Sequence, residues 1–287
     1  MRSRTAAALV LLAATTLWLY ADALAGLVRQ WQSDDNYSHG FFVVPLAAYF
    51  AWERRHALQD APYRPSFAGA VLVAVSLLLF VAGTFGAELF LTRASLVGVL
   101  AGSVLFLLGR EHLRLLLFPI GFLLLAIPLP AIVFNQIAFP LQLLASQAGE
   151  SVIAAAGIPV LREGNVLHLP VRTLEVAEAC SGIRSLVSLL MLAIVLGYFT
   201  EKSRPAWALI VLAAVPIAIL ANAARVAGTG LASEWISPAA ADGFFHTFSG
   251  WLMFVVAFIG LLAVQRALAA VRNRWPRRNG GAVVEAG

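Results

Sequence analysis

The chain has a single cysteine, Cys180, where a polar segment becomes apolar in "EVAEACSGIRSLVSLLMLAIVLGYF", residues 175–199. We expect a helix to begin near Ser181 or Gly182, with Ser181 as its cap, so that free amide groups lie beside the Cys180 sulfur. The partial positive charge of this helix end, and Arg184 one turn on, would favour the thiolate. These residues indicate a sulfur nucleophile. The alternative is a buried, inert cysteine, which is the usual role of a free cysteine.

A candidate cation lies near the end of the next apolar run, in "PIAILANAARVAGTG". Asn222 and Arg225 are three residues apart and would share one face of a helix, which Gly228 and Gly230 would allow the chain to leave. A charged side chain at membrane depth is costly unless it is paired or lines a polar cavity. We therefore expect Arg225 to point into a helix bundle. The alternative is an arginine that snorkels to the lipid headgroups.

A candidate base opens the last apolar run, "DGFFHTFSGWLMF". His246 would lie in the first turn of a helix, and Gly250, one turn on, would let a neighbouring helix approach the same face. Because the pKa of an imidazole is near neutrality, His246 could take a thiol proton and return it to a leaving amine. The alternative is a hydrogen-bonded polar residue at a helix end.

The composition indicates the scaffold that positions these residues. Of 287 residues, 61% are hydrophobic and 12% are charged, whereas about a quarter of the residues of a soluble domain are charged. Several apolar runs approach the roughly 20 residues needed to cross a bilayer. We predict an all-α integral membrane protein with about eight transmembrane helices, at residues 6–28, 40–52, 67–87, 91–109, 113–134, 182–199, 206–223 and 244–268.

The distribution of charge predicts the orientation. Eight crossings place most arginines and lysines on one side and most acidic residues on the other, so both termini would be cytoplasmic. Cys180, Arg225 and His246 then fall on three consecutive helices at the outer face, as covalent acyl transfer requires. The net charge of +5 follows from this topology and does not indicate nucleic acid. We interpret the first span as a retained anchor.

One long excursion, residues 135–181, separates the fifth and sixth spans on the outer side. Its first part is apolar with scattered polar residues, which favours a helix at the interface or in the mouth of the bundle. Its second part alternates around Gly164 and Pro170 and predicts short strands or a hairpin. We expect a membrane catalytic domain over residues 1–272 and a disordered cytoplasmic tail over residues 273–287.

Four blocks resemble those of the exosortase and archaeosortase family: "NYSHGFFVVPLAAYFAWERR", "AEACSGIRSL", "NAARVAGTG" and "FFHTFSGW". They span most of the chain in the family's order, and the chain resembles a bacterial exosortase of the A type without a fused C-terminal domain. The resemblance implies that Cys180 is the nucleophile, His246 the general base and acid, and Arg225 the stabiliser of the oxyanion or thiolate. It implies no cofactor, and the dispersed histidines suggest no metal site.

The resemblance also implies a substrate and a location. Family substrates are secreted, membrane-anchored proteins whose C-terminal sorting tail has a Pro-Glu-Pro motif, a membrane helix and a basic end. Cleavage would leave a thioester on Cys180, which water or a cell-surface acceptor nucleophile would resolve. Members with this layout accompany exopolysaccharide synthesis, which places the chain in the inner membrane of a Gram-negative bacterium with its site facing the periplasm.

Four further residues are candidates for contact with substrate. Arg184 or Arg172 would pair with the glutamate of Pro-Glu-Pro, unless Glu175 or Glu178 neutralises them. Asn222 would lie beside Arg225 in the site. His39 would line the entrance or make a structural hydrogen bond.

Two other functions remain open. Intramembrane charges and broken helices also occur in transporters, but no inverted repeat is visible and the ionisable residues gather at one face. The third possibility is a noncatalytic protein of exopolysaccharide assembly. Replacement of Cys180 by alanine or serine would distinguish these functions, because a transporter or assembly protein should keep working, whereas the enzyme should leave its substrate uncleaved.

Overall fold

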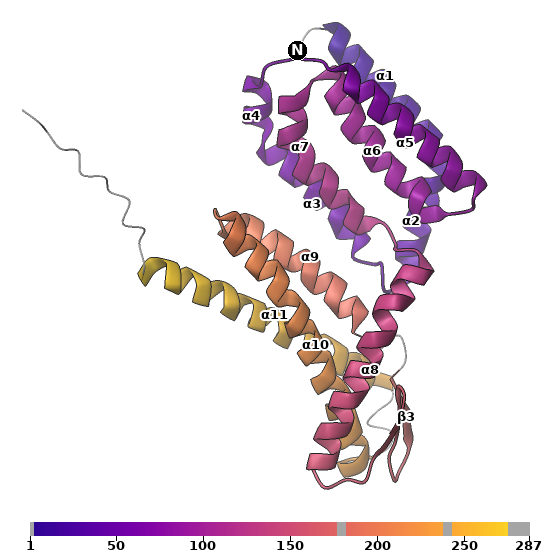
Figure 1. Cartoon of the computed structure of the whole chain (residues 1–287), viewed down its shortest axis with the longest axis vertical. Helices are drawn as coiled ribbons and strands as arrows, with labels where there is room; N and C mark the ends of the chain where they lie inside the picture. Colours follow the sequence, from indigo (N-terminus) through magenta and orange to yellow (C-terminus); the bar gives the residue numbers. More distant parts are fainter. Residues whose placement is uncertain (1–2, 177–181, 238–242, 275–287) are drawn as a thin grey trace, which may run out of the picture. The chain divides into compact units, whose positions relative to one another are not determined.

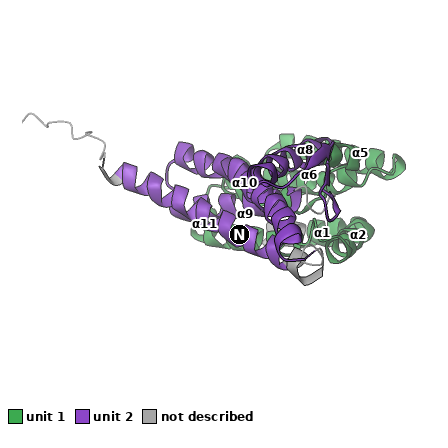
Figure 2. Cartoon of the chain, turned by 90° about the horizontal axis from the view of Figure 1, so that it is seen from below, with its two compact units in different colours: residues 1–135 green, residues 136–287 purple. Residues whose placement is uncertain are grey.

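A computed structural model describes residues 3–176, 182–237 and 243–274. The side chains of residues 3–9, 243–247 and 273–274 fall outside this description, as does nearly all of the predicted tail 273–287. The chain forms two compact units, residues 1–135 and residues 136–287, coloured green and purple in Figure 2. Each unit is described by itself.

The first unit is helical. Close packing of α5 and α6 dominates it, because Gly69, Gly83 and Gly102 bring the two backbones together: a Cβ on Gly69 would lie 2.2 Å from the Phe106 amide nitrogen. Its elements are α1 Ser3–Leu19, α2 Ala21–Ser33, α3 Gly40–Glu53, α4 Arg55–Asp60, α5 Phe67–Phe85, α6 Leu89–Leu107, α7 Arg110–Phe122 and the 3₁₀ helix η1 Leu123–Ala126 (Figure 1).

The predicted first span is two helices. α1 and α2 meet at Tyr20 with a bend of 64°. The Tyr20 ring is fully buried, and its hydroxyl lies 2.8 Å from the Ser95 hydroxyl of α6. A buried polar group is stable only when it is hydrogen-bonded, so this contact fixes the bend onto α6.

The predicted fifth span is also broken. α7 and η1 end before Pro128 and Pro130, and α8 begins at Ala131 and continues to Ala155. Proline removes an amide donor and restricts the residue before it, so a helix ends here. The boundary expected at residue 134 is therefore wrong, because the helix of the excursion has already begun.

The second unit has four helices and one small sheet among its described residues. Its elements are α8 Ala131–Ala155, β1 Leu161–Glu163, β2 Val166–His168, β3 Thr173–Glu175, α9 Ile183–Thr200, α10 Arg204–Trp235 and α11 Gly243–Arg274. The strands form an antiparallel sheet in the order β1-β2-β3. The expectation of a helix followed by short strands in the excursion is confirmed.

α10 packs against both α9 and α11 through small and branched side chains. Leu189 and Ala193 of α9, Ala214 of α10 and Leu261 of α11 belong to one buried cluster and have no exposed surface. Asn222 and Arg225 lie farther along α10, which has 32 residues. α10 does not end at Gly228 and Gly230 as expected, because Gly230 packs against Ile153 of α8 within the continuous helix.

Five helices are long and apolar enough to cross a membrane: α5, α6, α9, α10 and residues Phe248–Arg272 of α11. The bent pairs α1–α2 and α7–α8 raise the number to seven. α3 corresponds to the predicted second span but has only 14 residues. The described part of the chain is thus a multispan α-helical membrane protein, and the count of eight and the orientation remain predictions.

Candidate functional site

The helix that follows Cys180 begins against Asn222 of α10. Gly182 is the N-cap of α9, with a left-handed φ of 77° and no side-chain capping bond. A Cβ on Gly182 would lie 2.7 Å from Asn222 Cγ, so this position requires glycine both for its backbone conformation and for space. The expectation that Ser181 caps the helix is therefore wrong, since Gly182 occupies the cap position.

The same face of α10 contacts α11 through Arg225. The α-helix is continuous from Asn222 to Arg225, so the expected shared face is confirmed. A Cβ on Gly250 of α11 would lie 3.5 Å from Arg225 Cζ and 3.7 Å from both of its terminal nitrogens. Asn222 is 6% exposed and Arg225 is half-buried. One turn of α10 therefore presents an amide to the start of α9 and a guanidinium to α11.

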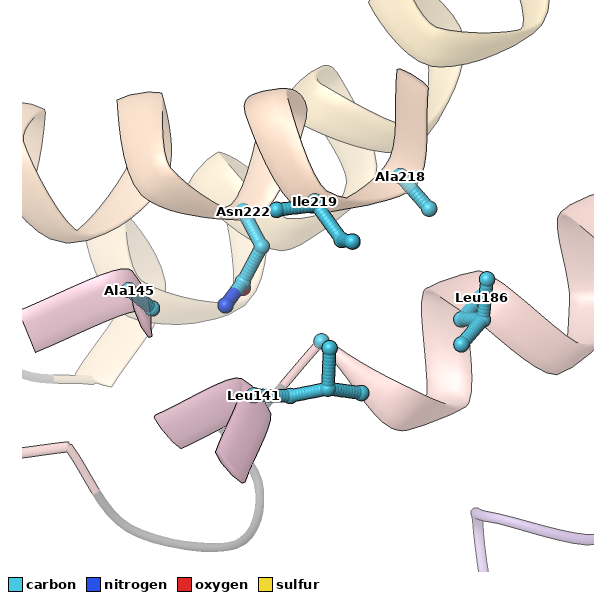
Figure 3. A pocket seen from close by; sticks show the side chains of 7 residues that line it. Leu141, Ala145, Leu186, Ala218, Ile219 and Asn222 are labelled. Atoms are coloured by element: carbon cyan, nitrogen blue, oxygen red, sulfur yellow. The ribbon is translucent and has the colours of Figure 1, made fainter. Parts of the chain in front are cut away.

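A small cavity lies beside Asn222, at the point where α8, α9 and α10 meet. Figure 3 shows Ala218, Ile219 and Asn222 projecting from α10 on the side of Leu141 and Leu186. The cavity volume is about 10 Å³, close to the minimum that holds one water molecule. The cavity is too small for a peptide, so Asn222 is enclosed by packed side chains on this side.

The sheet is also held against α10. Val176, which follows β3, is 2% exposed and packs in one cluster with Val226 of α10. The Val171 amide donates a 3.2 Å hydrogen bond to the Glu234 carboxylate near the end of α10. The chain is therefore held against α10 on both sides of residues 177–181. Val176 packs in the cluster of Val226, and Gly182 packs on Asn222, one helical turn away along α10.

Two of the three expected catalytic groups lie outside the described side chains. Cys180 falls within residues 177–181, for which no structure is described. The His246 backbone belongs to α11, one turn before Gly250, but its side chain is not described. Arg225 is described, and it lies on the face of α11 that carries Gly250.

The other predicted site residues have different surroundings. Arg184 is exposed in the first turn of α9, and Arg172 is half-buried between β2 and β3. Each of the two side chains interacts with at least one other group of the protein.

His39 belongs to the first unit and precedes α3. Its Nε2 atom lies 3.0 Å from the Leu125 carbonyl oxygen, and the side chain is 7% exposed. Burial lowers the pKa of His39 below its ordinary value, and backbone hydrogen bonds at Leu125 and Asn36 oppose this shift. His39 therefore makes the structural hydrogen bond that was its alternative role.

Several contacts around the site were not predicted. The packing of Gly182 on Asn222, the anchoring of Val176 and the Glu234 hydrogen bond all depend on tertiary structure. The glycine that follows Cys180 and Ser181 was the available signal, because a glycine before an apolar run suggests a positive φ or a close approach. Among the described residues, no group of three or more His, Cys, Asp or Glu side chains could hold a metal ion.

Comparisons with known proteins identify the family. Searches among curated proteins and among solved structures gave no match. A family model described as "Transmembrane exosortase (Exosortase_EpsH)" matches residues 31–263, which include Cys180, Arg225 and His246 and most of both compact units. The chain therefore belongs to the transmembrane exosortase family.

Proposed function

We propose that the chain is a membrane cysteine peptidase and transpeptidase that cleaves a C-terminal Pro-Glu-Pro sorting signal through a thioester on Cys180. Membership of the exosortase family supports a general role in protein sorting at a membrane. The substrate motif and the roles of Cys180, His246 and Arg225 are the finer steps proposed here. The substrates would be membrane-anchored proteins of a Gram-negative inner membrane, with the site facing the periplasm.

One observation carries the proposal: a single turn of α10 contacts both helices that adjoin the other two catalytic candidates. Asn222 lies against Gly182, and Arg225 lies against Gly250. Gly182 is two positions after Cys180 in the sequence, so their Cα atoms are at most roughly 7 Å apart. His246 is one helical turn from Gly250, a rise of roughly 6 Å. These short covalent paths support a common site for the sulfur, the imidazole and the guanidinium.

The first step would transfer the substrate acyl group to sulfur. His246 accepts the Cys180 thiol proton, and the thiolate attacks the scissile carbonyl carbon. The carbonyl π electrons move to oxygen, and Arg225 stabilises this developing negative charge. When the oxyanion collapses, the C–N bond breaks and His246 returns the proton to the departing amine. The products are a Cys180 thioester and the released C-terminal membrane helix.

The second step would release the acyl group. An acceptor amine or water loses a proton to His246 and attacks the thioester carbonyl. The C–S bond breaks, the Cys180 thiolate leaves, and the proton passes from His246 to sulfur. The half-buried position of Arg225 supports its part in both steps, because partial exclusion of water strengthens its interaction with an oxyanion.

Recognition of the motif is proposed to involve Arg184. Its side chain is exposed in the first turn of α9, four residues after Cys180. A guanidinium there is accessible to the glutamate of Pro-Glu-Pro. Arg184→Glu should lower processing, and a substrate with lysine in place of that glutamate should restore it. Unchanged processing by folded Arg184→Glu would remove this residue from recognition.

The central experiment is coexpression of the full chain with a protein that ends in a Pro-Glu-Pro sorting tail. Wild-type protein should give a shortened product on a gel, and Cys180→Ser should give none at equal membrane abundance. Ser188→Ala on α9 serves as the matched control and should cleave normally. A transporter or an assembly protein should keep its function in Cys180→Ser, so cleavage by this variant would overturn the proposed enzyme.

A thioester trap tests the intermediate directly. Wild-type membranes incubated with substrate should contain a covalent adduct that neutral hydroxylamine releases and that Cys180→Ser lacks. An adduct that survives hydroxylamine, or that forms in the serine variant, would contradict acyl transfer to this sulfur.

A further inference from the structure

A second arginine, Arg93, is buried in the first unit within the second turn of α6. It is 6% exposed, although α6 is a helix long and apolar enough to span a membrane. One terminal nitrogen donates a 2.6 Å hydrogen bond to the Gln30 side-chain oxygen of α2. Its Nε atom is buried and has no hydrogen-bond partner in the described part of the chain. A buried charged group with an unused donor is costly and requires a reason.

Two hollows meet at Arg93. The first is a cleft of about 290 Å³ between α1, α2 and the α5–α6 turn, with Asp22, Gly83, Thr84 and Thr92 in its wall. The second is an apolar cavity of about 80 Å³ enclosed mainly by α2, α6 and η1, with Leu27, Trp31 and Leu100 in its wall. Arg93 lines both. Arg93 thus borders both a wider, open cleft with some polar groups in its wall and a narrower, almost wholly apolar cavity.

A second arginine, Arg29 of α2, lies near Arg93. The NH2 atoms of Arg93 and of the exposed Arg29 both lie 3.8 Å from the position that a Cβ on Gly26 would occupy. Within the residues that the structure describes, no carboxylate lies within 4.0 Å of either guanidinium. Both groups are positively charged, and an anion bound between them would reduce their mutual repulsion.

We propose that Arg93 and Arg29 bind the phosphate of an anionic membrane lipid, with a hydrocarbon chain in the adjoining apolar cavity. Guanidinium groups match phosphate oxygens in a bidentate geometry, and the unused Nε–H of Arg93 supplies a further donor. Arg93 lies one turn from the start of α6, near the level where a span meets the lipid headgroups.

The surroundings favour a lipid over a soluble phosphate. Leu19 and Leu89 line the cleft and are 40% and 59% exposed. The neighbouring Trp18 is 82% exposed, as expected of a side chain at the membrane interface. A soluble anion would gain nothing from these apolar walls, whereas an acyl chain would be buried against them.

The test uses the purified full chain in detergent, stripped of lipid and then titrated with phosphatidylglycerol. Native mass spectrometry should show bound lipid, and Arg93→Gln and Arg29→Gln should each weaken binding roughly tenfold. Arg110→Gln removes an exposed charge at the start of α7 and should change binding by less than roughly twofold. Arg29 is exposed, so its variant tests the site even if Arg93→Gln fails to fold.

Two further ligands test whether the site recognises a phosphate group and whether that phosphate must belong to a lipid. Diacylglycerol with the same chains lacks phosphate and should bind at least roughly tenfold more weakly than phosphatidylglycerol. Inorganic phosphate should not displace the lipid at equal concentration. Equal affinity of Arg29→Gln and wild type for phosphatidylglycerol would overturn the site, and equal displacement by free phosphate would overturn the assignment to a lipid.

Discussion

The polar residues of the signature-like blocks have different surroundings in the two units. In the first unit, the His39 imidazole is buried and bound to the Leu125 carbonyl before α3 begins. In the second unit, Asn222 lies against Gly182 at the start of α9, and Arg225 lies against Gly250 of α11. The first arrangement fixes a fold, whereas the second brings polar groups to the elements that adjoin Cys180 and His246. A motif match alone does not distinguish these roles.

Replacement of Arg225 on α10 should have the largest effect on the cleavage rate. We predict that Arg225→Gln lowers the cleavage rate by about 10²–10³-fold, roughly 2.7–4 kcal/mol, because a preorganised charge at the oxyanion is removed. Coexpression with a sorting-tail substrate measures this effect. Arg114→Gln is the control, since its ion pair with Glu111 is exposed and should contribute less than about 1 kcal/mol. Near-normal cleavage by Arg225→Gln would place the residue among structural groups such as His39.

The contact at the start of α9 should have the next largest effect. Gly182→Ala combines a left-handed φ of 77° with a Cβ placed 2.7 Å from Asn222 Cγ. We expect it to cost about 1–3 kcal/mol of stability and to reduce cleavage. The measurement is thermal unfolding in detergent together with the coexpression assay.

Gly157→Ala supplies the matched control for that variant. Gly157 has a φ of 82° but no atom within 4 Å of its Cβ position. It should therefore show the backbone cost, about 1 kcal/mol, without loss of cleavage. Equal effects of the two variants on cleavage would mean that the packing of Gly182 on Asn222 has no functional role.

Acidification should affect the first unit through His39. Its pKa in the folded protein is lowered, so the unfolded chain binds more protons as the pH falls below the ordinary value of 6.5. Stability should therefore be complete above about pH 6.5 and decrease as the pH falls toward the lowered pKa. Thermal unfolding from pH 7.5 to pH 5 measures this slope.

His39→Gln should flatten the slope, since glutamine keeps a donor for the Leu125 carbonyl but does not titrate. The variant should also keep its cleavage rate per folded molecule. A selective loss of cleavage at full stability would return His39 to the substrate entrance.

The smallest effect is expected at Gly250. A methyl group there would meet the Arg225 Cζ atom at 3.5 Å, an ordinary van der Waals distance. Gly250→Ala should therefore lower cleavage only about twofold to fivefold, less than roughly 1 kcal/mol. Gly260→Ala on the same helix meets Ile217 at the same 3.5 Å and should leave cleavage unchanged. If the two variants behave alike, the approach of α11 to Arg225 is only packing.

The sequence was most informative where apolar length and composition decide the structure. α5, α6 and α9 begin and end within about two residues of the predicted spans, because a continuous apolar run has few alternatives in a membrane. The strands after Gly157 were also foreseen from alternation around Gly164. The predictions were wrong where long-range packing determines the structure. The first span is bent where Tyr20 contacts Ser95. α10 continues through Gly230, which packs against Ile153, instead of ending there.

The candidate site was predictable only where the spacing of residues within one helix decides the geometry. The spacing of Asn222 and Arg225 fixes a shared helix face without tertiary information. The partners of that face could not be read from spacing, since they depend on how α9 and α11 cross α10. Arg93 was predictable only in part as well. An arginine in an apolar run indicates a buried charge. Its partner Gln30 and most residues that line the two hollows are distant from it in the sequence, so they could not be predicted.

α10 is longer than the hydrocarbon layer of a bilayer is thick. Its 32 residues extend about 48 Å, whereas the oily layer of a bilayer is about 30 Å thick. Counted from Arg204, the helix has risen roughly 30 Å when it reaches Arg225, and its last turns continue for about another 15 Å. In the proposed topology, the last turns of α10 would hold the sheet outside the hydrocarbon layer, and the proposed substrate would have to extend its scissile bond to the level of Arg225. One inserted helical turn before Arg225 would then move the proposed site about 5.4 Å farther along the α10 axis.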